Sequence, residues 1–297
     1  MTMRVTNRMM VESAVRRMSA RLASFERTQN ALATGKRILT ASDDVAGMNR
    51  ALSVRAGLAA TAQAKRNADD GAMWVELADS RLASVVDGLQ RVRELAVSAR
   101  NPAANADALE AIANEVAELR EVFLSAANSR HRGRPLFSGF VADDPVVDVG
   151  GTWTYQGDNG QITRRVSDTD VVTINVTADD VFGFSDGEDL FGILDDLETK
   201  LRTGDRNGIG ASIDALDRAM GRVLEARSRL GAAGSRIEAA RFRADAEEVT
   251  LRAQLSSVED VDLAEAVMEL QLQEVAYQAA QGALAKALQP SLAAFLR

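Results

Sequence analysis

The sequence predicts a mainly α-helical protein: a long antiparallel, coiled-coil-like helix bundle built from both chain ends, with a small inserted β-rich domain. The main observation is the spacing of apolar residues, which recur every three, four or seven positions in the segments outside the middle of the chain. That repeat is typical of helices that pack along a narrow seam. The composition agrees, because 46% of the residues are hydrophobic but only 4% are aromatic, which suits long helices joined by small aliphatic side chains.

The composition also excludes several classes of function. The 297-residue chain has no cysteine and one histidine, so it can form no disulfide, thiolate nucleophile or multi-histidine metal site. Its apolar runs are far shorter than the roughly 18 to 20 residues of a membrane-spanning helix, and the first residues lack the apolar stretch of a secretory signal peptide. A net charge of −8 argues against general nucleic-acid binding. We therefore expect no cofactor, metal, nucleic acid or membrane partner.

The N-terminal part of the chain predicts a helix with one apolar stripe. The residues of this stripe are Val11, Val15, Met18, Leu22, Phe25 and Leu32. Gly35 ends this helix, and we expect the next to begin with Ser42 as its N-cap and to run to about Ala99, where Asn101-Pro102 breaks it. The second and third helices carry their own apolar rows: Val75, Leu82, Leu89 and Ala96; Ala78, Val85, Val92 and Ala99; Leu109, Val116 and Phe123; Ile112, Leu119 and Ala126.

The C-terminal third repeats this pattern. Helical spacing is seen first at Leu190, Leu194, Leu197 and Leu201. Two seven-residue rows follow, Ile209 to Leu230 and Ile237 to Val258, and we expect them to be offset across Gly231 and Gly234. The last helix carries a stripe formed by Leu263, Val267, Leu270, Tyr277, Leu284 and Leu288.

The middle of the chain reads as a small β module. Helical periodicity stops after Phe137, and Val171–Thr177 is a β-branched run that predicts a strand. We also expect a hairpin in which residues 153–156 and 161–163 pair across Gly157–Gly160, because Asn159-Gly160 is a strong turn signal. The predicted division is therefore residues 1–40 with 259–297 as a terminal polymerisation domain, 41–138 with 190–258 as a helical rod, and 139–189 as an inserted acidic domain.

The charges support a pairing of the two chain ends. Residues 1–40 carry eight basic and two acidic side chains, so +6, whereas residues 259–297 carry two basic and six acidic ones, so −4. If the acidic insert, with two arginines and eleven acids, lies at the far tip of an antiparallel bundle, the two ends meet at the other tip. We expect charge pairing within one subunit or between neighbours by Arg16, Arg17, Arg21, Glu265, Glu269 and Glu274.

The terminal helices are expected to need neighbouring subunits. A hairpin of two helices with narrow apolar stripes is only marginally stable on its own. We therefore expect the ends to be disordered in the monomer and to fold as the subunits polymerise.

No catalytic arrangement emerges from the remaining motifs. His131 lies in the polar segment 128–135, where no motif supplies a base and a nucleophile, so a plain loop histidine is favoured. The flanking arginines Arg130, Arg132 and Arg134 lack the interleaved aromatics of a nucleic-acid site. The acids at 179, 180, 186, 188 and 189 do not match the spacing of a calcium loop. Residues 157–160 precede no helix and form no phosphate cradle.

Both ends of the chain resemble the flagellin superfamily. The segments that carry the resemblance are Met3–Asn7, Leu32–Ile38, Ser42–Asp44, Asp260–Val267 and Tyr277–Ala280. Within this superfamily the chain looks most like the hook-associated protein 3 family, because of the segments Gly133–Gly139, Tyr155–Asp158 and Val181–Gly183. One departure is Val45, where that family usually has proline.

The resemblance implies a non-catalytic adaptor of the bacterial flagellum. It implies secretion through the flagellar type III apparatus without a cleaved signal peptide, and an export chaperone on the C-terminal helix. It further implies a homo-oligomeric ring between hook-associated protein 1 and the flagellin filament. The two terminal stripes would pack in an inner helical layer, with the insert facing outward. The alternatives are a filament flagellin, an enzyme built around His131, and a cytoplasmic coiled-coil scaffold.

Overall fold

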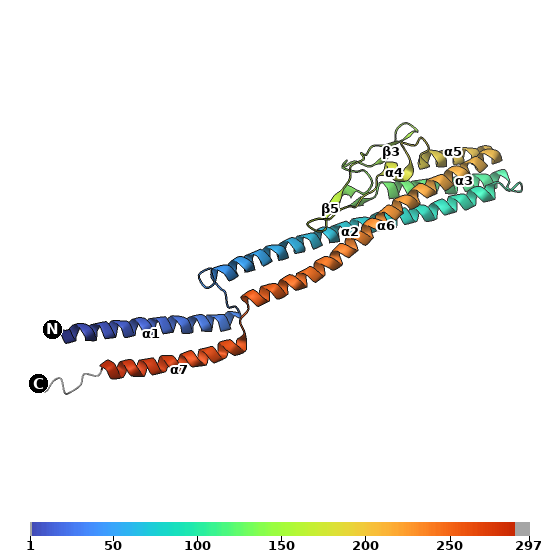
Figure 1. Cartoon of the computed structure of the whole chain (residues 1–297). Helices are drawn as coiled ribbons and strands as arrows, with labels where there is room; N and C mark the ends of the chain where they lie inside the picture. The colour runs from blue at the N-terminus through green and yellow to red at the C-terminus, as the bar shows by residue number, and fades with distance from the viewer. Residues whose placement is uncertain (1, 289–297) are drawn as a thin grey trace. The chain divides into compact units, whose positions relative to one another are not determined.

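The computed structural model describes residues 2–288. It forms two compact units, which we call the terminal unit (the chain up to Ala59 and from Glu248 onward) and the central unit (Ala60–Glu247). Two long helices, one in each half of the chain, run through the boundary between them (Figure 1). Each unit is described by itself below.

The secondary structure is mainly helical, with short strands confined to the middle of the chain. The helices are α1 (Thr2–Thr34), α2 (Val45–Ala99), α3 (Ala106–Ala127), α4 (Ala178–Phe182), α5 (Leu190–Thr203), α6 (Arg206–Glu259) and α7 (Leu263–Leu288). The strands are β1 (Arg130–His131), β2 (Arg134–Pro135), β3 (Val146–Asp148), β4 (Trp153–Tyr155), β5 (Thr163–Arg165) and β6 (Val171–Thr173). This order confirms the predicted fold class.

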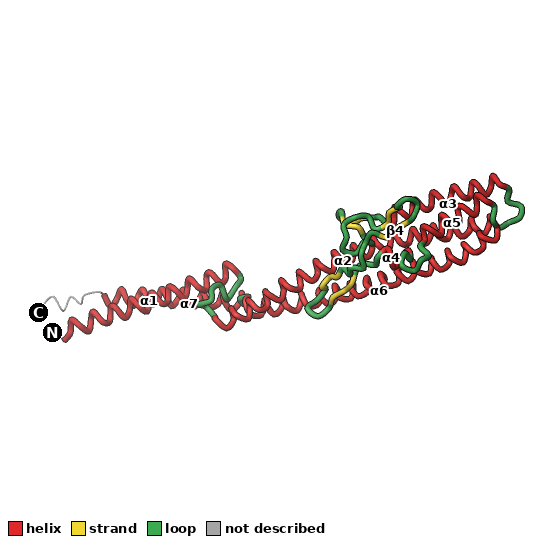
Figure 2. Tube along the Cα trace, turned by 90° about the horizontal axis from the view of Figure 1, so that it is seen from above, coloured by secondary structure: helices red, strands yellow, loops and turns green. Residues whose placement is uncertain are grey.

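In the central unit, α2, α3, α5 and α6 lie alongside one another around one apolar core (Figure 2). The heptad rows predicted in α2 form that core: Leu82, Val85, Leu89 and Val92 are completely buried. Ion pairs flank the seam between α2 and α6. In one of them, Arg227 Nε lies 2.8 Å from Asp79 Oδ1. The periodicity in the sequence therefore identified the buried faces of the long helices.

Two details of the helices differ from the prediction. The apolar row of α6 continues without an offset, because neither Gly231 nor Gly234 adopts a positive φ and the helix passes straight through both. The N-cap of α2 is Asp44, whose Oδ1 accepts from the Gly47 amide at 2.8 Å. Ser42 instead shares a hydrogen bond with the Thr40 hydroxyl, because the carboxylate two residues later is the side chain placed to cap the first turn.

The insert contains three separate two-stranded antiparallel ladders, which pair β1 with β2, β3 with β4, and β5 with β6. The predicted hairpin across Gly157–Gly160 is therefore wrong, because β4 pairs backward with β3 and not forward with β5. The β3–β4 turn is built on Gly150 and Gly151, at φ of 67° and 84°. This Gly-Gly pair is itself a hairpin signal.

The Asn159-Gly160 segment does not form a hairpin because its polar groups bind neighbouring segments instead. Asp158 Oδ1 accepts from the amides of Phe140 at 2.7 Å and Gly160 at 2.9 Å. The side chain of Asn175 accepts from the Ile162 amide and donates to the Gly160 carbonyl. The chain from 156 to 162 is thus fixed as a loop between the two halves of the insert.

In the terminal unit, α1 and α7 lie side by side and antiparallel (Figures 1 and 2). An isolated β-bridge between Lys36 and Asp260 joins the segments that connect them to α2 and α6. The Arg37 amide donates to the Glu259 carbonyl at 2.6 Å, and the Val261 amide donates to the Gly35 carbonyl at 3.0 Å. The charge-based prediction that the two chain ends pair is consistent with this arrangement.

Within residues 2–288, every helix is too short or too polar to cross a lipid bilayer.

Candidate functional site

The terminal helix pair carries the residues predicted to mediate assembly. Phe25 and Leu32 of α1 and Leu270 and Tyr277 of α7 are half-buried, as is Met18. At the centre of the pair, Gln273 is 9% exposed and its Nε2 donates to the Ser24 hydroxyl at 3.2 Å. One side of each predicted stripe therefore lies within this pair.

The other side of each stripe remains open to solvent. On α1, Val15 and Leu22 are 50% and 41% exposed, and on α7, Leu263 and Val267 are 58% and 44% exposed. The sequence reasoning missed a further outward row on α7, formed by Met268, Leu272 and Val275, whose side chains are between 63% and 72% exposed. The side chains of Val11, Leu284 and Leu288 lie outside the described residues.

The predicted charge pairs do not form within the described part of one chain. Arg17 donates to Ser13, Glu269 accepts from Gln273, and Glu274 accepts from Gln278. Arg16, Arg21 and Glu265 form no ion pair with another residue that the structure describes. Pairing with a neighbouring subunit stays a proposal.

A buried carboxylate fixes the base of the terminal unit. Glu259, with 3% of its side chain exposed, lies 3.0 Å from Lys36 Nζ and 2.7 Å from Arg55. Burial raises the pKa of Glu259, but the hydrogen bonds and positive charges of Lys36 and Arg55 outweigh burial, and the net pKa lies below its ordinary value. We call these three residues the Glu259 clasp.

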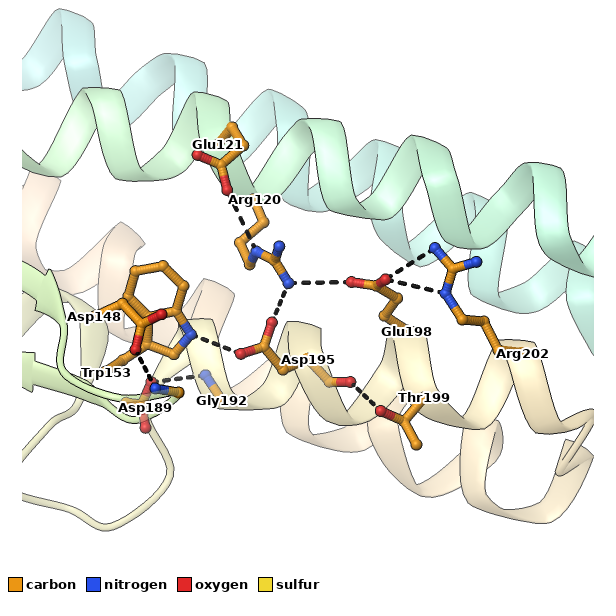
Figure 3. A network of polar contacts seen from close by, with 11 residues as sticks. Arg120, Glu121, Asp148, Trp153, Asp189, Gly192, Asp195, Glu198, Thr199 and Arg202 are labelled. Carbon is orange, nitrogen blue, oxygen red and sulfur yellow. Dashed lines mark hydrogen bonds and ion pairs between the residues drawn. The ribbon is translucent and has the colours of Figure 1, made fainter.

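A polar network connects the insert to the helices of the central unit (Figure 3). The indole Nε1 of Trp153, on β4, donates to Asp195 Oδ2 at 2.7 Å, and the other oxygen of Asp195 accepts from Arg120 of α3. The Arg120 guanidinium also lies 5.9 Å from the centre of the Trp153 ring, which is cation–π distance. Three elements, α3, β4 and α5, therefore meet at one carboxylate.

The network continues along α5. Arg120 reaches Glu198 at 3.1 Å, and Glu198 in turn pairs with Arg202 one turn further on. The Trp153 ring also packs against Phe191, with 5.1 Å between the ring centroids, and Phe191 packs on Phe182 of α4. No sequence pattern predicts this network, since its members are separated by up to 82 positions and follow no common motif.

The single histidine lies in a structural contact. His131 on β1 packs edge-on against Trp74 of α2 with 5.8 Å between ring centroids. Its Nε2 and the Trp74 Nε1 are both buried without a hydrogen-bond partner. Across residues 2–288, acidic side chains and this histidine form no group that could hold a metal ion.

These features describe a helical structural protein whose paired ends expose apolar rows. The chain belongs to the flagellin family: the family model for the bacterial flagellin N-terminal helical region matches residues 5–142, and that for the C-terminal helical region matches residues 213–296. Members of this family are structural components of the flagellum, so the chain is a flagellar structural protein and not an enzyme.

The curated relatives span nearly the whole chain. A flagellin of Bacillus subtilis is 27% identical and covers 97% of both chains. A flagellin of Halalkalibacterium halodurans is 29% identical and covers 93% of both. Flagellar hook-associated protein 3 of Salmonella typhimurium is 24% identical and covers 93% of this chain and 94% of its own.

Solved structures show the same fold. A putative flagellar hook-associated protein from Vibrio parahaemolyticus superposes with a TM-score of 0.70 at 18% identity, over 73% of this chain and 100% of its own. FlgL of Xanthomonas campestris superposes with a TM-score of 0.62 at 21% identity, over 68% of this chain and 99% of its own.

Proposed function

We propose that this chain is a structural adaptor at the junction between the flagellar hook and filament. The observation that carries the proposal is the fold. Hook-associated and FlgL structures superpose on this chain over 98 to 100% of their own lengths with TM-scores from 0.57 to 0.70. Hook-associated protein 3 from two bacteria also matches more than nine-tenths of the chain in sequence.

The proposed mechanism is coupled folding and assembly of the terminal helices. The pair formed by α1 and α7 covers only part of its apolar surface, since Leu272 and Val275 are 72% and 67% exposed. Contiguous exposed apolar rows mark protein contact surfaces. Burying each such side chain contributes about 1.5 to 3 kcal/mol. Neighbouring copies that cover these rows would complete an inner helical layer, with Arg16, Arg17 and Arg21 facing Glu265, Glu269 and Glu274 of adjacent subunits.

The proposed partners follow from the position that we propose for this chain in the flagellum. Copies of the chain would form a ring, with hook-associated protein 1 on one side and flagellin on the other. Before assembly, an export chaperone would cover the C-terminal helix, whose outward row includes Met268. Export would proceed through the flagellar apparatus without a cleaved signal peptide.

Immunogold electron microscopy with an antibody against the insert tests this proposal. We expect one narrow band of label where the hook meets the filament. A strain that lacks the gene, labelled in parallel, controls for cross-reaction with flagellin. Label in the cytoplasm alone would contradict the proposal and favour a scaffold.

Filament flagellin is the second candidate. It is favoured by the sequence matches to flagellins at 27% and 29% identity, each over at least 93% of the chain. In the same experiment a flagellin gives label along the whole filament. That outcome would keep the assembly mechanism but move the chain from a single ring to the bulk polymer.

A further inference from the structure

A groove of about 600 Å³ lies between the insert and α6. One wall is formed by the loop 159–161, by β6 and by the start of α4, and the other by the stretch of α6 from Arg229 to Arg236. The β5 end of the insert lies beside the long helices in Figure 1. This volume falls within the range of about 300 to 1,000 Å³ that is typical of small-molecule sites.

Part of the groove lining consists of uncharged polar side chains that are free to bind a ligand. Asn159 and Gln161 are exposed and Thr173 is half-buried, and none of the three forms a side-chain hydrogen bond with another residue in the described range. Together they offer two amides and a hydroxyl, each of which can donate and accept. They come from two different segments of the insert, and both segments belong to the same wall of the groove.

The backbone of β6 adds another donor and acceptor at the same place. Ile162 and Ile174, which lie next to the ends of β5 and β6, form a hydrogen-bonded pair, because the Ile174 amide donates to the Ile162 carbonyl. Since such pairs alternate along an antiparallel ladder, Thr173 belongs to a non-hydrogen-bonded pair with Thr163. Its own N–H and C=O therefore point away from β5, toward the side where β6 has no neighbouring strand.

The charged groups around the groove are already paired. Arg236 lies 2.6 Å from Asp170, and Arg229 lies 3.7 Å from Asp180. Asp179 accepts from the Ser185 amide and hydroxyl. An ionic ligand would have to displace one of these contacts, whereas a neutral ligand would leave them intact.

The apolar lining of the groove offers little accessible surface of its own. Val172 and Leu230 line it but are almost fully buried. Phe140 is not a lining residue, but its ring is 61% exposed and lies against Gly160, which lines the groove, so closely that a Cβ on Gly160 would be 2.4 Å from Cδ2 of the ring. An exposed aromatic face beside amide side chains suits the apolar C–H faces and the hydroxyl groups of a sugar ring.

We propose that this groove binds a neutral oligosaccharide. The amides of Asn159 and Gln161 and the exposed groups of Thr173 hydrogen-bond the sugar hydroxyls, while Phe140 stacks on a ring face. An extended peptide fits less well, because β6 presents the free backbone groups of Thr173 but the carbonyl of Val171 is held by Arg236. A strand added at this edge would thus be limited to a very short ladder.

The test is a titration of the full chain with chitotriose, maltotriose and cellotriose, followed by saturation-transfer difference NMR, together with a printed array of neutral glycans. We expect at least one saccharide to bind. Asn159→Ala and Gln161→Ala should each weaken that binding by about 3- to 10-fold, the value of one net hydrogen bond. Asn207→Ala and Gln90→Ala, at exposed positions outside the groove, are matched controls that should leave it unchanged.

The outcomes distinguish a saccharide site from a peptide site and from a general loss of folding. Circular dichroism and melting temperature must be the same for the groove variants and the controls, so that loss of binding reports the groove itself. Binding that persists in both groove variants, or no saccharide bound at about 10 mM, overturns the proposal. Selection of peptides from a displayed heptapeptide library that lose binding in the groove variants, with no saccharide bound, would replace it with a peptide site.

Discussion

The Glu259 carboxylate and the Lys36 ammonium lie 3.0 Å apart, although the two residues are 223 positions apart in the chain. Lys36 follows α1, and Glu259 ends α6, so this contact joins the connection after the first helix to the connection before the last. Arg55, on the first turns of α2, adds a second cation at 2.7 Å. A carboxylate with 3% exposure needs such partners, because burial without them would favour its neutral form.

We predict that the Glu259 clasp loosens in acid. Its pKa lies below the ordinary value of 4.5, so the folded state holds the proton less tightly than the unfolded state. The stabilisation is therefore fully present above about pH 4.5 and is lost as the pH falls through the lowered pKa. The protection factors of the Arg37 and Val261 amides, which compare the measured exchange rate with the intrinsic rate at the same pH, should fall in this range. In Glu259→Gln both protection factors should already be lower at pH 7, with little further change in acid; protection factors that match the parent chain at every pH would contradict the role of the clasp.

The long helices could be predicted from the sequence because their packing is periodic. Leu82, Leu89 and Val85 fall on the two seven-residue rows of α2, and all three are completely buried. In α3, Val116 and Phe123 follow the same rule. A helix that packs along its whole length against another repeats its contact every two turns, so the sequence alone identifies the buried face.

The insert could not be predicted in this way because its contacts are neither local nor periodic. Asn159-Gly160 is a strong hairpin signal, but Asp158 within the turn binds the amide of Phe140, and Asn175 from outside the turn binds the Gly160 carbonyl. The meeting of Trp153, Asp195 and Arg120 likewise depends on how three elements pack. The outward row on α7 was missed for a different reason. Met268 and Leu272 lie off the seven-residue stripe, so the repeat does not select them, and only their exposure beside α1 identifies them as a second apolar row.

Two glycine-to-alanine substitutions should have opposite effects on the central unit. At Gly88 of α2, a Cβ would lie 2.3 Å from Cε1 of the completely buried Phe123. Overpacking of this kind destabilises by about 1 to 3 kcal/mol, more than the roughly 0.5 to 1 kcal/mol gained from helix propensity. At Gly231 of α6, nothing lies within 4 Å of the new Cβ. Thermal unfolding should show a lower midpoint for Gly88→Ala and a slightly higher one for Gly231→Ala; a raised midpoint for Gly88→Ala would mean that Phe123 can move aside.

The hydrogen bond between Trp153 and Asp195 should contribute more to the free energy of unfolding than an exposed ion pair does. We predict a coupling of about 1 to 2 kcal/mol in a double-mutant cycle of Trp153→Phe and Asp195→Ala, because a charged acceptor strengthens the bond. The control cycle uses Arg93 and Asp217, which are 47% and 44% exposed and 2.7 Å apart, and should give less than about 1 kcal/mol. Equal couplings from denaturant unfolding would show that the network adds nothing beyond a surface contact.

The two faces of α7 should respond differently when an aspartate replaces a leucine. Leu270 is half-buried in the pair with α1, as is Phe25 on the other helix. Leu270→Asp and Phe25→Asp should therefore weaken the pair itself and also block incorporation into the flagellum. Leu272 is 72% exposed, so Leu272→Asp should leave the hydrogen exchange of the isolated chain unchanged and still block incorporation. The central unit should remain folded in all three, which circular dichroism of the soluble chains checks.

The comparison of Leu272→Asp with Leu272→Ala decides between assembly and simple folding as the role of the outward row. Each side chain buried between subunits contributes about 1.5 to 3 kcal/mol, and alanine gives up most of that without adding a charge. We expect immunogold labelling of the appendage to fall partly with alanine and to vanish with aspartate, at equal levels of exported protein. Full incorporation of Leu272→Asp would show that this row stays exposed in the assembled flagellum. The inner layer would then be held by the stripe between α1 and α7 alone.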